Sequence, residues 1–195
     1  MLRFLLASFA ALLVTACGGG DAAPKDAGFA GQCEFITGGG ATIAAHPDSG
    51  CTDCSAGNVE RAADGDLASA ALIAGGYYPA DCGLLGCRSD AQGIEVRAKA
   101  QPGVVYPAGN VAGAWMKSNG SWAASIATYL NGELQEGGRN TQGSVSGGDP
   151  GYLGIETQKP FDEVGIYLQH NADDAATMDL VEICSDSPFL RQFSP

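Results

Sequence analysis

Short runs in which apolar and polar side chains alternate dominate the second half of this 195-residue chain. The alternation is clearest at residues 94–99, 122–130 and 164–169, and residues 177–184 continue it. A period of two places the apolar side chains on one face of an extended backbone. Each run therefore predicts a β-strand with one buried face.

Turn signals separate these runs. Asn131-Gly132 directly follows the run at 122–130, and this dipeptide favours a two-residue hairpin that would place Tyr129 opposite Leu134. Glycine- and proline-rich turns are also expected at 101–103, 118–120 and 147–151, and a loop is expected over 137–150. The alanine-rich segment 62–74 lacks helix caps and contains Gly65, so no helix is predicted there.

The composition supports one globular all-β domain. Hydrophobic residues make up 45% of the chain, enough for a core, and short strands between glycine turns predict an antiparallel sandwich or barrel. Acidic residues outnumber basic ones 22 to 10, giving a net charge of −12. Nucleic acid is therefore not expected as a partner, because phosphate binding needs a basic surface.

The first residues indicate export. Arg3 precedes an apolar run over 4–14 that is too short to span a bilayer. Val14-Thr15-Ala16-Cys17 resembles a bacterial lipobox, which implies removal of residues 1–16 and acylation of Cys17; the alternative is an ordinary secretory signal. Gly18 after the cysteine favours the outer membrane of a bacterial envelope. The lipid would be the only membrane contact.

The chain is therefore expected to have three parts. Residues 1–16 form the signal peptide, and residues 17–31 form an acylated, glycine-containing tether. Residues 32–195 form a single β-sandwich domain.

Six cysteines remain after Cys17, and export favours disulfides among them. Six cysteines allow fifteen pairings. The expected pairs are Cys51–Cys54, Cys82–Cys87 and Cys33–Cys184. A zinc site near His46 and a thioredoxin-like role for the Cys-Thr-Asp-Cys segment are the alternatives.

One segment suggests a family. Residues 51–58 lead into Ala-Ala-Asp-Gly-Asp-Leu-Ala-Ser at 62–69, which resembles the segment that opens discoidin-like, or galactose-binding-like, modules. Shorter pieces at 106–113, 127–132 and 157–164 are similar to a bacterial surface-protein variant of that module. The resemblance covers about residues 51–184. It implies a jelly-roll antiparallel β-sandwich that acts in recognition or adhesion.

The resemblance also implies a metal site. In calcium-dependent members, the Asp-Gly loop and a late glutamate bind one ion, and the matching positions here are Asp64, Asp66, Ser69 and Glu182. Carboxylate and hydroxyl oxygens suit this hard cation. This chain departs from the pattern with Ser69 in place of threonine and Ala71 in place of an aromatic residue. The alternative is an ordinary Asp-Gly turn without metal.

No catalytic motif is present. The segment at 143–147 has Val145 where a Gly-x-Ser-x-Gly motif needs serine, and His46 and His170 have no marked nucleophile. Asp162 and Glu163 would point to opposite faces of an extended strand and so could not act as a carboxylate pair. A non-catalytic protein is therefore expected.

The two tryptophans, Trp115 and Trp122, flank a turn and could stack on a sugar; core packing is the alternative.

The function expected is a lipid-anchored envelope module that recognises carbohydrate or mediates adhesion. The alternative is an envelope structural or assembly protein that binds a protein partner.

Overall fold

The computed structural model describes part of the chain. The described residues are 34–36, 41–49, 51, 54–66, 68–74, 81–83, 86–88, 93–138, 143–146, 151–170 and 177–186. The signal peptide, Cys17, the tether and Cys33 lie outside them. No helix within these ranges is both long and apolar enough to cross a membrane.

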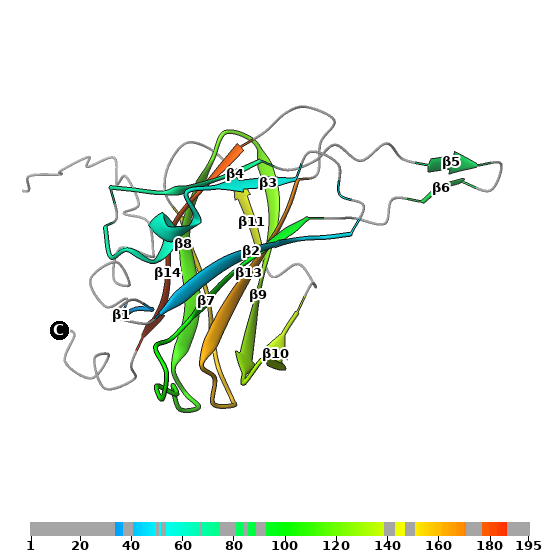
Figure 1. The fold of residues 1–195 in the computed structure, drawn as a ribbon. Helices are drawn as coiled ribbons and strands as arrows, with labels where there is room; N and C mark the ends of the chain where they lie inside the picture. Colours follow the sequence, from blue (N-terminus) through cyan, green and yellow to red (C-terminus); the bar gives the residue numbers. More distant parts are fainter. Residues whose placement is uncertain are drawn as a thin grey trace, which may run out of the picture.

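Two antiparallel sheets lie face to face (Figure 1). Sheet A has the strand order β12 (Gly151–Glu156), β8 (Val111–Ser118), β14 (Thr177–Asp186), β4 (Ala71–Ala74) and β3 (Ser55–Gly57), with β1 (Glu34–Phe35) also paired to β14. Sheet B has the order β10 (Glu133–Gly137), β9 (Ser121–Leu130), β13 (Glu163–His170), β7 (Ile94–Lys99) and β2 (Thr42–Pro47), with β11 (Gly143–Ser146) also paired to β9. The antiparallel β-sandwich predicted from the sequence is therefore confirmed.

Two smaller elements complete the description. A 3₁₀ helix, η1 (Val59–Ala63), packs its buried Ala62 against the main core. The strands β5 (Asp81–Gly83) and β6 (Gly86–Arg88) form a separate hairpin that projects away from the two sheets in Figure 1.

The core lies between the sheets and follows the predicted alternation. Sheet B contributes inward-facing side chains from its three central strands, and sheet A contributes those of β4, β8 and β14. The largest fully buried side chains are Trp122, Phe161, Ile36, Ile73, Ile94, Met116, Ile126, Ile166, Leu168, Met178, Leu180 and Ile183.

The predicted hairpin is confirmed in its register. Tyr129 faces Leu134 across β9 and β10, and both turn residues have positive φ, 54° at Asn131 and 83° at Gly132. The loop expected over 137–150 is wrong in part, because residues 143–146 form β11 beside β9. Four residues are too few for the alternation of apolar and polar side chains to identify a strand there.

The disulfide predictions have different outcomes. Cys51–Cys54 is confirmed, and Cys184 is disulfide-bonded. Its predicted partner Cys33 lies outside the described residues, so that pairing stays a prediction. The hairpin register places Cys82 opposite Cys87 on the backbone, and a bond between them also stays a prediction.

Candidate functional site

The first candidate site is the Asp-Gly loop, residues 64–69, of which residue 67 lies outside the described part. It connects η1 to β4 beside an interruption in sheet A. On one side of β14, β4 pairs with residues 177–180 and β1 pairs with residues 184 and 185. No strand pairs on that side between them within the described chain. The loop lies beside this interval.

An irregularity in β14 coincides with this interval. The register with β8 shifts between Leu180 and Glu182, so Val181 is an extra residue, as in a β-bulge. Glu182 Oε2 accepts a hydrogen bond from the Gly65 amide at 3.3 Å. Two segments 117 residues apart in sequence therefore meet here, as the discoidin-like resemblance requires.

Glu182 is an unusual carboxylate. Its side chain is fully buried, and Oε1 has no hydrogen-bond partner. The pKa of Glu182 is raised to about 7, chiefly by burial and also by the negative charges of Asp64 and Asp66, while the backbone of Gly65 and of Asp64 opposes the shift. A buried carboxylate with a free oxygen is costly unless a proton or a cation neutralises it.

The loop's own acidic side chains are exposed and engaged locally. Asp64 accepts hydrogen bonds from the Asp66 amide at 2.8 Å and from the Ser69 hydroxyl at 2.7 Å. Asp66 accepts one from the Ala68 amide at 2.9 Å. These are the bonds of an ordinary Asp-Gly turn. Among the described residues, no group of three or more His, Cys, Asp or Glu side chains is arranged to hold an ion.

The four predicted calcium ligands therefore fit such an ion in part. The orphaned oxygen of Glu182 supplies one buried anionic ligand beside the loop. Asp64, Asp66 and Ser69 supply oxygens nearby. Both carboxylate oxygens of Asp64, Oδ1 of Asp66 and the Ser69 hydroxyl already form hydrogen bonds within the turn.

The two tryptophans do not form a sugar-stacking surface. Trp122 has no exposed area and packs in the main core, so we do not retain it as a ligand contact. Trp115 is 9% exposed and packs on the outer side of sheet A against Tyr152, with ring centroids 5.3 Å apart. The strands place them on different sheets: Trp115 is in β8 of sheet A, and Trp122 is in β9 of sheet B.

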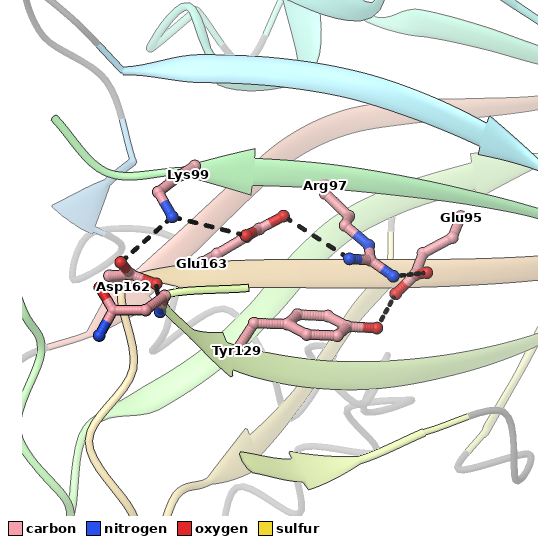
Figure 2. A network of polar contacts seen from close by, with 7 residues as sticks. Glu95, Arg97, Lys99, Tyr129, Asp162 and Glu163 are labelled. Atoms are coloured by element: carbon pink, nitrogen blue, oxygen red, sulfur yellow. Dashed lines mark hydrogen bonds and ion pairs between the residues drawn. The ribbon is translucent and has the colours of Figure 1, made fainter. Parts of the chain in front are cut away.

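The second candidate site is a set of charged side chains with one tyrosine on the outer side of sheet B, shown in Figure 2. We call it the charged face. It comprises Glu95, Arg97, Lys99, Tyr129, Asp162 and Glu163. These residues come from the three adjacent strands β7, β9 and β13 and from the bend before β13.

Arg97 is at the centre of the charged face. Its guanidinium carbon lies 3.9 Å from the centroid of the Tyr129 ring, and one terminal nitrogen donates to Glu95 Oε2 at 2.7 Å. The Tyr129 hydroxyl donates to Glu95 Oε1 at 2.6 Å. Burial and this hydrogen bond raise the pKa of Tyr129. Stacking and hydrogen bonding together hold the guanidinium in one plane.

Glycine makes this arrangement possible. Gly165 of β13 lies between Arg97 and β9 in the register. A Cβ there would collide with Glu95 Oε1 and lie 3.1 Å from the Tyr129 ring. The absence of a side chain lets Tyr129 and Glu95 meet above the central strand.

The condition under which Asp162 and Glu163 would diverge, a strand extended through both residues, is not met. Lys99 Nζ lies 3.2 Å from Asp162 Oδ2 and 3.9 Å from Glu163 Oε2. The strand begins only at Glu163, and Asp162 lies in the preceding bend, so strand alternation does not apply to the pair. Asp162 also accepts a hydrogen bond from the Asn131 amide at 3.1 Å, which ties the hairpin turn to this face.

The charged face was not predicted as a site. A signal was present in Glu95, Arg97 and Lys99, which alternate along a single strand. That pattern alone describes a solvated face, and nothing local to it identifies Tyr129 or Glu163 as neighbours.

Comparison with known proteins gives no family. No protein-family model matches the sequence, and no curated protein matches it. Similar solved structures exist, and each of those described next is a carbohydrate-binding module.

The family 32 module of C. perfringens NanJ, solved with galactose, is 14% identical, with a TM-score of 0.43 over 75% of this chain and 93% of that one. A pectin-binding module is 15% identical, with a TM-score of 0.45 over 78% and 94%. The family 32 module of AlyQ, solved with 4,5-unsaturated mannuronic acid, is 12% identical, with a TM-score of 0.43 over 80% and 98%.

All three TM-scores are below 0.5. The fold described above therefore rests on the two sheets of this chain, and the ligands of those modules are not carried over to it.

Proposed function

We propose that this chain is a non-catalytic carbohydrate-binding module of the bacterial cell envelope. One observation carries the proposal: Gly65 of the Asp-Gly loop donates a hydrogen bond to Glu182 within a two-sheet sandwich. The discoidin-like resemblance predicts that Glu182 lies beside the Asp-Gly loop, and recognition is the role that the resemblance implies.

The test of binding is a glycan array and a polysaccharide pull-down, each run once with calcium and once with a chelator. Binding to a glycan supports the proposal. If no glycan binds under either condition, the alternative of an envelope protein with a protein partner is favoured. Sugar analysis of the incubated polysaccharides tests the non-catalytic part, since release of shorter products would contradict it.

We also propose that a lipid on Cys17 holds the module at the envelope, with the outer membrane favoured. The lipobox resemblance supports this. Metabolic labelling with a radioactive fatty acid should label the wild-type protein and should not label Cys17→Ala. Equal labelling of both proteins would contradict acylation at Cys17.

One structural calcium ion is proposed at the Asp-Gly loop. Glu182 would hold it through the free oxygen, and Asp64, Asp66 and Ser69 would complete the oxygen ligands after giving up bonds within the turn. The bound ion would supply charge neutralisation for the buried carboxylate. Calorimetric titration with calcium should give a binding isotherm for the wild type and none for Glu182→Gln. An isotherm unchanged in that variant would contradict the site.

A further inference from the structure

Within the charged face, the two carboxylate oxygens of Glu163 are left without hydrogen bonds. Glu163 Oε1 lies 4.0 Å from an Arg97 nitrogen, and Glu163 Oε2 lies 3.9 Å from Lys99 Nζ. Both distances are too long for hydrogen bonds. Glu163 therefore has two acceptor oxygens without hydrogen bonds, and each has a cationic donor beside it.

The other carboxylates of this face are already engaged. Glu95 accepts from Arg97 and from Tyr129 through its two oxygens. Asp162 accepts from the Asn131 amide with one oxygen and pairs with Lys99 through the other. The carboxylate oxygens of this face without hydrogen bonds are thus those of Glu163, and the buried Arg97 Nε is a donor of the same face that also has no hydrogen-bond partner.

The surroundings leave Arg97 partly and Lys99 more fully open to solvent, although Arg97 Nε is itself buried. Their side chains retain 26% and 40% of their exposure, whereas that of Glu163 retains 12%. The edge strand β2 places exposed Ala44 beside Arg97 and exposed Thr42 beside Lys99. Both neighbours are small, so no long side chain of that strand covers the cations.

A hydroxyl group matches each gap between Glu163 and a cation. A hydroxyl donates one hydrogen bond and accepts others, so it can accept from a cation and donate to Glu163 at the same time. Two such groups, one for each oxygen of Glu163, are what adjacent hydroxyls of a sugar ring supply. Both cations are already paired with acidic groups, so they need no anionic ligand.

The charge of the face selects against an acidic sugar. Three carboxylates stand against two cations here, and the whole chain carries a net charge of −12. A ligand carboxylate placed beside Glu163 would be repelled.

Resting on the carbohydrate-binding function above, we propose that the charged face binds a neutral sugar through two adjacent hydroxyl groups, held between Arg97, Glu163 and Lys99. Tyr129 and Glu95 fix the plane of Arg97 and are positioning residues.

The test is calorimetric titration of the full-length protein, purified in detergent, with neutral galactan and with polygalacturonate. These polymers offer a neutral hexose and its C6 acid. The wild type should bind galactan. Glu163→Gln removes one acceptor and should weaken binding roughly 10- to 100-fold, the effect of losing a hydrogen bond to a charged group.

The matched control is Asp179→Asn. Asp179 pairs with Lys117 at 3.7 Å on the outer side of sheet A, and the substitution again converts a paired carboxylate to an amide. It should leave the galactan affinity unchanged. A second measurement is independent of any variant: galactan should shift the Arg97 side-chain N–H resonance of the wild-type protein.

The outcomes separate the two proposals. Galactan binding that Glu163→Gln does not weaken, with an unshifted Arg97 resonance, overturns the charged face and leaves the binding function standing. Tighter binding of polygalacturonate, strengthened by Glu163→Gln, overturns the neutral ligand. If the wild type binds neither galactan nor any glycan on a wider array, the carbohydrate-binding function itself is contradicted.

Discussion

At the scale of single residues, the buried Glu182 carboxylate opposes folding when it is ionised. A fully buried carboxylate is stabilised in its protonated form, and its pKa of about 7 lies above the ordinary value of 4.5. The folded protein therefore binds more protons than the unfolded chain between pH 4.5 and 7. Stability falls as the pH rises through this window, by at most about 3 kcal/mol.

We expect wild-type protein in chelator to have a lower free energy of unfolding at pH 7.5 than at pH 5. Glu182→Gln should remove most of this slope, whereas Glu60→Gln, an exposed position on η1, should keep it. Added calcium should flatten the wild-type profile at the alkaline end. Urea unfolding at several pH values measures this, and a slope equal in all three proteins would rule out Glu182 as its source.

Gly165 is constrained by its neighbours. Gly165→Ala should destabilise the protein by about 1–3 kcal/mol, because the new Cβ collides with the Glu95 carboxylate and lies 3.1 Å from the Tyr129 ring. Gly57→Ala is the control, since nothing lies within 4 Å of its Cβ position. Thermal unfolding should show a lower Tm for the first variant only. An equal fall in Tm for both variants would mean that the contacts of Gly165 with Glu95 and Tyr129 are not the reason for its loss of stability.

At the scale of elements, the hairpin between β9 and β10 depends on its turn. Gly132 has φ of +83°, so Gly132→Ala should cost about 1 kcal/mol. Gly151→Ala, with no positive φ and open space around its Cβ, should cost less. Because Asp162 binds the Asn131 amide, the turn variant should also shift the NMR signals of Lys99. Unchanged Lys99 signals would separate the turn from the charged face.

The elements show what the sequence could predict. Residues 94–99 and 122–130 alternate for long enough to identify a strand and its buried face. The four residues of β11 do not, and pairing with β9 determines their conformation. Strand alternation also failed at Asp162, where a bend precedes the strand.

The two candidate sites also differ in how far the sequence could predict them. The approach of Glu182 to the Asp-Gly loop followed from a resemblance that covers most of the domain, whereas its hydrogen bond with Gly65 did not. The charged face could not be predicted, because it joins β7, β9 and β13 through a register that only the folded sheet defines. The burial of Trp122 likewise depends on which side of β9 faces the other sheet.

For the whole molecule, the disulfides should differ in their effect. Closing the short loop between Cys51 and Cys54 stabilises by about 2 kcal/mol in the chain-entropy model. A bond between Cys33 and Cys184 would close a loop of about 150 residues and contribute about 5 kcal/mol. Removing both cysteines of the long loop should therefore lower stability more than removing Cys51 and Cys54.

Guanidinium unfolding of the two double serine variants measures this difference. Peptide mapping without reductant should first recover Cys33 joined to Cys184. A different partner for Cys184 would contradict the pairing. Equal losses of stability in the two variants would contradict the entropy argument.

On the outer sides of both sheets, as in a protein core, close packing leaves no room for a larger side chain at certain positions. Tyr152 lies over Gly113 and Gly154 on sheet A, as Tyr129 lies over Gly165 on sheet B, and a Cβ at any of these glycines would meet a ring atom. Selection acting on descendants of this chain should hold these glycines fixed while neighbouring surface positions drift. Directed evolution of new binding specificity should therefore vary the residues around each ring and leave the glycines beneath it untouched.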